Sequence, residues 1–430
     1  MLTTVRTHGF AADPELPQRD GLLDAEAVAE RLPALLGLGS LRSCNLLRAK
    51  YRIGESLRVV YRLDTGSREH LLAARAFPAG RGGSAYRRAV IAAVPGDGLP
   101  PVVLDQESEA VWWTFPNDRR LLGLSDLMHP LGSVHPSWQR SEAVEYAPER
   151  SVTLRATALD GTTAGYAKVF APGSVDVAGL AGRYRRIAAA LAGRGETVQS
   201  PDALCWSDER QLLLLSAMPG VRWADLPTAD LLGTLRRLGA AIAALHDAGP
   251  AALGDDHPAA GLQPFTRLAL PRVTHSAELV GLARPDVAAR ARRLAARLAG
   301  AVPAPDRPVL LHGDCHPKNA LVDAQQIGLI DLDQAGTGAA ANDIGSLLAR
   351  LRQDELIGGP PAAELAAAFL AGYAGVRPPP VDSALHWHTA AALLAERAMR
   401  AVNRVHLPAL QHLDELLAEA ERTLSKGLLL

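Results

Sequence analysis

Three polar residues between positions 314 and 331 have the types and the spacing that phosphoryl transfer requires. Asp314 is followed after five positions by Asn319 and after a further twelve by Asp331. One carboxylate must lie at the attacking hydroxyl group, while an amide oxygen and a second carboxylate hold a divalent metal ion on the phosphates. These residues therefore predict transfer of a phosphoryl group from a nucleoside triphosphate.

Apolar segments beside these residues indicate how the chain positions them. The run Val309-Leu310-Leu311 is typical of a buried strand that ends at the loop of Asp314. Two apolar runs around the Asp323-Ala324 turn predict a hairpin that returns Asp331 to the side of Asn319. A strand, a loop and a hairpin would thus bring the three side chains together.

Other polar residues of this segment have less specific interpretations. Asp333 is either a ligand of a second metal ion or a solvated carboxylate. Lys318 is a catalytic candidate that would meet the γ-phosphate or the substrate, and a solvated surface lysine is the alternative. His312 and His316 are expected to be structural. Cys315 is expected to be a small buried side chain, because nucleophilic catalysis would need an activated thiolate.

The segment from His312 to Asn319 resembles the catalytic loop of the aminoglycoside phosphotransferase and choline kinase-like family, a branch of the protein-kinase-like superfamily. The resemblance implies that Asp314 is the catalytic aspartate and that Asn319 and Asp331 hold the metal ion. It also implies that Asp343 braces the loop from the start of the next helix. The implied cofactors are ATP, or another nucleoside triphosphate, and Mg²⁺.

Further residues are candidates for nucleotide binding. Lys168, one of only four lysines, lies in an alternating strand pattern. The family places a lysine on the third strand of its N-lobe against the α- and β-phosphates, which implies this role for Lys168. The helix expected over 177–192 offers no glutamate to pair with it. The other candidates are turn residues that would cover the phosphates and hinge residues that would contact adenine: Arg150 and Ser151, and Ser216, Ala217 and Met218.

The N-terminal half contains an internal repeat. The segment 51–57 resembles 146–152, and farther along the chain Arg75 aligns with Lys168. We interpret the repeat as a duplicated kinase N-lobe whose first copy does not bind ATP, because Arg75 replaces the lysine. The alternative is an accidental likeness of two β-rich segments.

These patterns predict an α+β chain with the bilobal protein-kinase-like fold: a small antiparallel β N-lobe, a mainly helical C-lobe and a duplicated N-lobe-like domain at the N-terminus. The expected parts are an extension with a helix over 1–42, a degenerate N-lobe-like cap over 43–135, the N-lobe over 141–226 and the C-lobe over 227–430. Apolar periodicity predicts C-lobe helices over 228–247, 278–302, 361–376, 381–404 and 409–429.

Composition excludes several classes of protein. The 430 residues carry a net charge of −1 without a basic cluster in the sequence, which argues against nucleic acid as a partner. Three scattered cysteines favour a reducing compartment. The first residues lack the apolar core of a signal peptide, and no apolar run has the length of a membrane span. We therefore expect a cytoplasmic protein without a membrane partner.

The resemblance implies an ATP- and Mg²⁺-dependent kinase whose acceptor is a hydroxyl group of a small molecule, such as an amino sugar, an aminoglycoside-like antibiotic, a sugar or an amino alcohol. The C-terminal segment is not strongly acidic, which suits a polycationic aminoglycoside poorly. One alternative is a peptide Ser/Thr kinase of natural-product maturation. The other is a non-catalytic, pseudokinase-like binding module, against which the intact Asp314, Asn319 and Asp331 argue. Nothing in the sequence indicates the oligomeric state.

Overall fold

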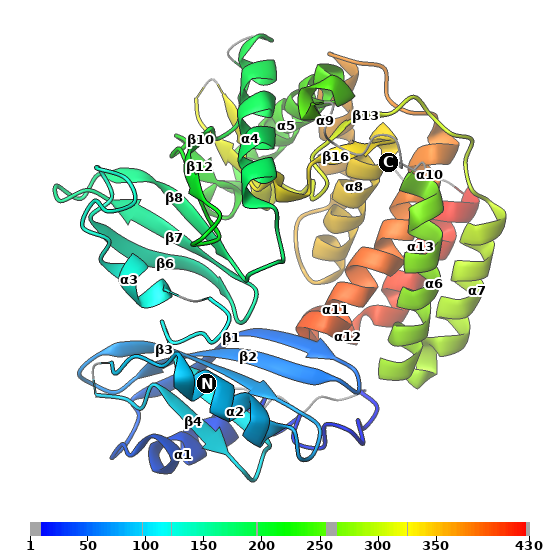
Figure 1. The fold of residues 1–430 in the computed structure, drawn as a ribbon. Coiled ribbons are helices and arrows are strands. Elements are labelled where there is room, and N and C mark those ends of the chain that lie inside the picture. Colours follow the sequence, from blue (N-terminus) through cyan, green and yellow to red (C-terminus); the bar gives the residue numbers. More distant parts are fainter. Residues whose placement is uncertain are drawn as a thin grey trace. The chain divides into compact units, whose positions relative to one another are not determined.

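The N-terminal part of the chain forms a five-stranded antiparallel sheet (Figure 1). The computed structural model describes residues 10–96, 98–121, 123–194, 197–254, 265–324 and 326–426, with only the backbone for 265–269. The strand order is β1-β2-β3-β5-β4. Its elements are α1 (Ala25–Leu36), β1 (Ser43–Arg52), β2 (Ser56–Asp64), β3 (Glu69–Ala76), α2 (Gly82–Ile91), β4 (Val102–Asp105) and β5 (Ala110–Thr114).

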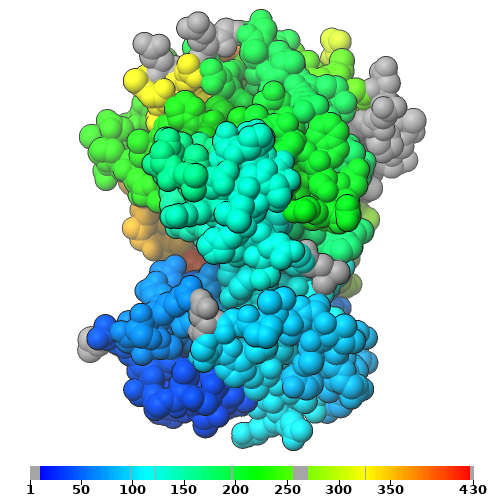
Figure 2. Space-filling model, turned by 60° about the vertical axis from the view of Figure 1, so that its left-hand side comes forward, coloured from blue at the N-terminus to red at the C-terminus, as the bar shows by residue number. Residues whose placement is uncertain are grey.

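Helix α1 covers one face of this sheet. Asp24 caps the helix, because its carboxylate accepts hydrogen bonds from the N–H groups of Glu26 (3.0 Å) and Ala27 (3.3 Å). Val28 and Leu32 of α1 pack with apolar side chains of β1 and β2 into one core. In the space-filling view, the blue to cyan residues of this part form a continuous body (Figure 2).

The next segment forms a second five-stranded sheet with the order β10-β11-β8-β7-β6. Its elements are β6 (Arg140–Ala147), β7 (Ser151–Thr157), β8 (Thr163–Phe170), β10 (Ala203–Ser207) and β11 (Leu212–Leu215); α3 (Leu124–Met128) precedes it and α4 (Val177–Ala192) follows β8. The antiparallel sheets and many helices agree with the α+β class expected from the sequence and with a kinase-like fold.

The two sheets share one strand order and one register. Arg75 lies between Arg58 and Val111 in the first sheet, and Lys168 lies between Thr153 and Leu213 in the second. Each sheet also has a helix after its third strand, α2 or α4. Arg75 and Lys168 therefore occupy matching strand positions, as the repeat predicts. Descent of the two sheets from one duplicated unit stays a prediction.

A shared apolar core joins the two sheets. Val60 and Trp113 of the first sheet pack with Val152, Ala167 and Val169 of the second. Ala167 and Val169 flank Lys168, so strand alternation places the Lys168 side chain on the opposite face of its sheet. In the first sheet, by contrast, the face that bears Arg75 is the one turned to this core. The first sheet is thus covered on both faces.

The chain divides into two compact units. The first ends at Ala178 and adds Leu204–Ser216 and Asn403–Val405; the second consists of the remaining segments from Gly179 onward. The second unit is mostly helical, with two small sheets of order β12-β14-β15-β9 and β13-β16. Its strands are β9 (Val198–Gln199), β12 (Val221–Arg222), β13 (Val309–Leu311), β14 (Ala320–Val322), β15 (Ile327–Leu329) and β16 (Gly336–Gly338).

Helices make up most of the second unit (Figure 1). They are α5 (Leu231–Ala248), α6 (Phe265–Ala283), α7 (Ala288–Gly300), α8 (Ala340–Leu356), α9 (Ala362–Ala374), α10 (Asp382–Ala392), α11 (Met399–Arg404), α12 (Leu407–Gln411) and α13 (Leu413–Lys426), with a π-helical segment over Leu393–Ala398. Helices α5 and α9 touch backbone to backbone at Gly239 and Gly372, where an added Cβ would lie 2.0 Å from the Phe369 oxygen and 1.8 Å from the Arg236 oxygen. Only glycine permits this approach.

The prediction of one helix over 278–302 was wrong. Helix α6 ends at Ala283 and α7 begins at Ala288, with a 3-10 turn over Pro285–Val287 between them. The break follows from Pro285, because a proline disfavours the helical conformation of the residue before it. The helix expected over 381–404 is likewise interrupted by the π-helical segment Leu393–Ala398. No helix among the described residues is long and apolar enough to cross a membrane.

Candidate active site

The loop that carries Asp314 begins where buried strand β13 ends. Gly313 has a φ of 81°, and a Cβ there would lie 2.1 Å from the backbone oxygen of Gln334. Glycine is therefore required, both for the left-handed conformation and for the close approach of the Asp314 loop to the segment after Asp331. The strand and the loop expected from the sequence are both present.

Asp343 fixes this loop from the first turn of α8. Its carboxylate accepts hydrogen bonds from the backbone N–H groups of His312 (2.6 Å) and Gly313 (3.0 Å), and lies 3.2 Å from Nε2 of His246. Burial alone would raise the pKa of Asp343, but the hydrogen bond and charge of His246, with the charge of His312, hold the pKa below its usual value. The carboxylate is thus a permanent anchor for the loop.

Asp314 itself is held as a carboxylate. Burial would raise its pKa, but His316 by hydrogen bonding and charge, together with the charges of Arg400 and His312, holds the pKa well below the usual range. Nε2 of His316 lies 3.6 Å from Oδ2 of Asp314, and the buried Nδ1 of His316 has no hydrogen-bond partner among the described residues. The structural role expected for His316 therefore includes a direct electrostatic effect on Asp314.

Hydrogen bonds connect the two expected metal ligands to the loop of Asp314. Nδ2 of Asn319 donates to the backbone oxygen of Asp314 (3.0 Å), and the N–H of Ile330 donates to the backbone oxygen of Asn319 (2.9 Å). The hairpin of β14 and β15 pairs Ala320 with Leu329, which returns the chain to Asn319. The strand–loop–hairpin arrangement expected around these residues is observed in the second unit.

The donor set suits a hard divalent cation that also binds phosphate. The amide nitrogen of Asn319 is used by the backbone, so its Oδ1 is the atom that would face a metal ion, together with the half-buried carboxylate of Asp331. Mg²⁺ prefers oxygen ligands and takes few of them from protein, the rest being water and substrate phosphates. Among the described residues, no three His, Cys, Asp or Glu side chains form a group that could hold a metal ion.

Asp331 has a left-handed backbone conformation, with φ 61° and ψ 50°. This conformation is rare outside glycine and frequent at functional sites.

Tyr184 of α4 is a residue that the sequence analysis did not connect with the site. Its hydroxyl donates a hydrogen bond of 2.8 Å to Oδ1 of Asp333, and its side chain is fully buried. Burial, followed by the charges of Asp333 and Asp331, raises the pKa of this phenol well above its usual value, so the hydroxyl stays a donor. The only signal in the sequence was its place in the repeat, opposite Tyr86. Helix α4 lacks the expected glutamate but contacts the segment of Asp331 and Asp333 through Tyr184.

Replacing Tyr184 by phenylalanine is expected to destabilise the second unit. The change removes a hydrogen bond to a carboxylate, which is worth about 1.5–3 kcal/mol. Urea unfolding of the whole protein measures the effect. Tyr166→Phe is the matched control, since the Tyr166 hydroxyl has no hydrogen-bond partner among the described residues. Equal stability of the two variants would contradict a stabilising role for the Tyr184–Asp333 bond.

The remaining candidates lie in both units. Lys168, Arg150, Ser151 and Ser216 belong to the first unit, whereas the second contains Ala217, Met218, Lys318 and the acidic candidates. The boundary thus falls between Ser216 and Ala217, inside the segment expected to be a hinge.

Lys318 is exposed, and desolvation followed by the charge of Arg350 lowers its pKa. Cys315 is buried as expected, and burial raises the pKa of its thiol well above the usual value.

The turn between β6 and β7 differs from the expected phosphate-covering turn in one respect. The N–H of Glu149 donates to Oδ2 of Asp118 (2.6 Å), and the N–H of Arg150 donates to the oxygen of Ala147 (3.0 Å). Ser151 pairs with Ala147 across the hairpin. Because the two N–H groups at the tip already have acceptors, they are not open donors for phosphate. The Arg150 side chain and the Ser151 hydroxyl are left as the groups of this turn that would cover phosphates.

Glu149 is held by three arginines. Its side chain is fully buried, and Oε2 contacts Nε of Arg58 (2.8 Å) and Nη1 of Arg75 (2.7 Å) while Oε1 contacts the guanidinium group of Arg119. Burial would raise the pKa of Glu149, but the charges of Arg75, Arg119 and Arg58 outweigh it and lower the pKa. Sequence reasoning missed this cluster because it joins residues 30 to 91 positions apart.

Comparison with known proteins finds one family. A family profile described as the phosphotransferase enzyme family (APH) matches residues 157–379, more than half of the chain. No curated protein matches the sequence.

The solved structures that match include a macrolide phosphotransferase, an aminoglycoside phosphotransferase and a protein of the choline/ethanolamine kinase family. The macrolide 2′-phosphotransferase MphH of Brachybacterium faecium is 22% identical, covering 70% of this chain and 98% of that chain with a TM-score of 0.43. The aminoglycoside-3′-phosphotransferase of type VIII is 25% identical, with coverages of 62% and 96% and a TM-score of 0.44. A choline/ethanolamine kinase family protein of Mesorhizobium loti is 14% identical, with coverages of 70% and 93% and a TM-score of 0.45.

Proposed function

We propose, on the premise that the chain belongs to the phosphotransferase enzyme family, that it transfers the γ-phosphoryl group of ATP to a hydroxyl group of a small molecule. The family predicted from the residues around Asp314 is confirmed by the profile match. The single observation that carries the proposal is the hydrogen-bonded connection of Asp314, Asn319 and the residue before Asp331.

In this proposal Asp314 orients the hydroxyl group of the acceptor. A carboxylate whose pKa is held well below the usual range is a weak base, so its main contribution is to accept a hydrogen bond from the hydroxyl and aim its oxygen at phosphorus. A loose transition state needs little activation of the nucleophile. The hydroxyl proton then moves to Asp314 late, as the new P–O bond forms.

Asn319 and Asp331 are proposed to hold Mg²⁺, which neutralises charge on the phosphates when it is bound. Lys168 is proposed to contact the α- and β-phosphates, with Arg150 covering them. Asp333 either reaches a second metal ion or holds the metal-binding segment through Tyr184. The backbone of Ser216, Ala217 and Met218 is proposed to contact adenine, which is supported by their place at the boundary between the units.

Some of the charged groups near Asp314 are cations. Arg400 acts on Asp314, and the charges of Arg350 and Arg400 act on Lys318. A polycationic substrate would be repelled by these cations. We therefore propose a sugar or a similar neutral or acidic alcohol as the acceptor rather than a polycationic aminoglycoside.

A transfer assay with labelled ATP tests the function directly. The panel contains neutral sugars, sugar acids, aminoglycosides and Ser/Thr peptides, each tested with the native protein and with Asp314→Asn. We expect labelling of a neutral or acidic alcohol by the native protein alone. Labelling of peptides alone would support the peptide kinase, and nucleotide binding without any transfer would support a non-catalytic binding module.

Replacing Asp331 by alanine is expected to weaken the binding of Mg²⁺-ATP. Even partners outside the first coordination sphere contribute about 10- to 100-fold to metal affinity, so the loss of a ligand should cost at least as much. Titration with ATP in the presence and absence of Mg²⁺ measures it, with Asp323→Ala on the same hairpin as the control. Unchanged affinity with Mg²⁺ would contradict the role of Asp331.

Residues 43–135, which contain the first sheet, are proposed to be a degenerate N-lobe that serves as a cap. The shared strand order and the matching places of Arg75 and Lys168 support a common origin. The face that bears Arg75 packs on the second sheet through Val60 and Trp113. This packing covers part of the face equivalent to that of Lys168, which supports a first copy that does not bind the nucleotide as the second does.

A further inference from the structure

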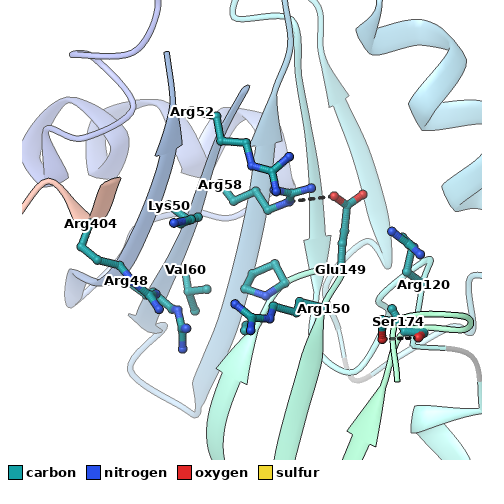
Figure 3. A pocket seen from close by; sticks show the side chains of 13 residues that line it. Arg48, Lys50, Arg52, Arg58, Val60, Arg120, Glu149, Arg150, Ser174 and Arg404 are labelled. Carbon is teal, nitrogen blue, oxygen red and sulfur yellow. Dashed lines mark hydrogen bonds and ion pairs between the residues drawn. The ribbon is translucent and has the colours of Figure 1, made fainter. Parts of the chain in front are cut away.

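The first unit contains a strongly basic pocket with a volume of about 240 Å³. Six arginines and one lysine line it, with Glu149 as the only carboxylate among the lining residues. The whole chain has a net charge of −1, so this concentration of cations is local and does not reflect a basic protein. Figure 3 shows these side chains gathered from strands of the first sheet, from the turn that carries Arg150, from the loop of Arg120 and from the end of α11 at Arg404.

Strand alternation builds one wall of this basic pocket. Arg48, Lys50 and Arg52 point to the same face of β1, while Ala49 and Tyr51 between them are buried on the other face. Three cations thus follow one another along one face of β1. This is unusual, because elsewhere the same face of the first sheet packs into an apolar core.

A row of like charges crosses three neighbouring strands. Lys50 lies directly opposite Arg58, and Arg58 lies directly opposite Arg75. Like charges at facing positions destabilise a sheet. The corresponding row of the second sheet is Glu145, Thr153 and Lys168, which contains one cation and one carboxylate.

Carboxylates contact several of these cations. The single carboxylate of Glu149 is shared by Arg58, Arg75 and Arg119. Arg48 pairs with Glu145 (2.7 Å) and Arg52 with Glu55 (3.4 Å), but both carboxylates are 66% exposed. Such exposed pairs contribute little.

Arg150 lies in the same pocket. It makes no ion pair with any residue that the structure describes. Among the residues that line the basic pocket, one carboxylate thus faces seven cations, and Glu149 also contacts Arg75 and Arg119 outside the lining. This excess of cations over carboxylates in the lining favours the binding of an anion.

We propose that the basic pocket binds a compact polyanion that carries at least two phosphate groups. Guanidinium groups bind phosphate through paired hydrogen bonds, which accounts for the predominance of arginine. The volume is below the roughly 300–1,000 Å³ of sites for drug-sized ligands, so a pyrophosphate or tripolyphosphate group fits better than a large organic molecule. Most of its cations belong to the cap, Arg150 and Arg404 come from other segments, and the site is additional to the proposed kinase activity.

Isothermal titration of the metal-free protein with pyrophosphate and tripolyphosphate tests the proposal. The variant Lys50→Met/Arg52→Met keeps the apolar stems and removes two charges, and we expect the dissociation constant to rise by about tenfold or more, since charge-assisted bonds to phosphate are among the strongest hydrogen bonds. Arg87→Met/Arg88→Met is the matched control, because both arginines are exposed on α2 outside the pocket. The control should bind like the native protein.

The nucleotide site is a second possible source of polyanion binding, and Lys168→Met distinguishes it, because Lys168 is the residue proposed to contact the phosphates there. If the basic pocket is the site, metal-free pyrophosphate binding survives Lys168→Met and is weakened in the Lys50/Arg52 variant. If the binding is unaffected by the Lys50/Arg52 variant, or equally weakened by the Arg87/Arg88 control, the proposal is wrong. A circular dichroism spectrum like that of the native protein shows that each variant is folded. If the Lys50/Arg52 double variant does not fold, the single variant Arg48→Met provides a second test. Failure of the kinase assay with intact pyrophosphate binding would overturn the proposed function without affecting this site.

Discussion

Asp314→Asn is expected to lower kcat for phosphoryl transfer by about 10²- to 10⁴-fold, the range attributed to positioned acid–base groups. The asparagine keeps the shape of the side chain but removes the charge that accepts the hydroxyl proton. The backbone of the loop should keep its place, because Asp343 holds the N–H groups of His312 and Gly313 independently of the Asp314 side chain. Nucleotide affinity should therefore change little.

Steady-state kinetics with the acceptor found in the panel, together with ATP titration, separate these effects. Asp323→Asn is the control, since it removes the same charge from the turn of the neighbouring hairpin, where the Asp323 carboxylate only accepts the N–H of Ala324. Turnover by Asp314→Asn within a few-fold of the native rate would show that another group positions the hydroxyl.

Glu149→Gln is expected to destabilise the first unit by about 3–5 kcal/mol, the cost of leaving buried charges without their partner. Three guanidinium groups converge on this fully buried carboxylate, and only one amide oxygen would remain to receive them. Lys50 faces Arg58 across the strands, so repulsion among the cations adds to the loss.

Urea unfolding measures this change, because urea, unlike guanidinium, does not screen charges. Glu145→Gln is the control: Glu145 pairs with Arg48 at 2.7 Å but is 66% exposed, and such pairs contribute at most about 1 kcal/mol. If the two variants lose equal stability, the Glu149 cluster is not the stabilising element that its burial indicates.

The stabilisation by Glu149 should depend on pH in a defined direction. The folded-state pKa of Glu149 is lowered, so the carboxylate stabilises the fold fully above the pKa of an unfolded glutamate, about 4.3. As the pH falls below that value, protonation favours the unfolded chain and this stabilisation is lost. The difference in unfolding free energy between the native protein and Glu149→Gln should accordingly shrink in acid.

The sequence alone determined the features that depend on neighbouring residues. The spacing of Asp314, Asn319 and Asp331 reflects a loop and a hairpin that are local in the chain, so residue types and apolar runs were sufficient to predict them. Helix α4 was predicted with its observed bounds, Val177–Ala192, because apolar periodicity is also a local property. Pro285, by contrast, was a local signal that the prediction of a single helix over 278–302 overlooked.

Only the tertiary structure decided which distant groups meet. Tyr184 and Asp333 are 149 positions apart, and Glu149 meets Arg58 across 91 positions. No period or spacing in a sequence encodes such pairs, because they depend on how separate elements pack. Arg48, Lys50 and Arg52 alternate like any half-exposed strand, and what makes them a basic pocket is the approach of Arg58, Arg120 and Arg150 from other segments. Chemistry carried by one loop is thus visible in the sequence, whereas charge that is assembled from several strands appears only once the sheets have formed.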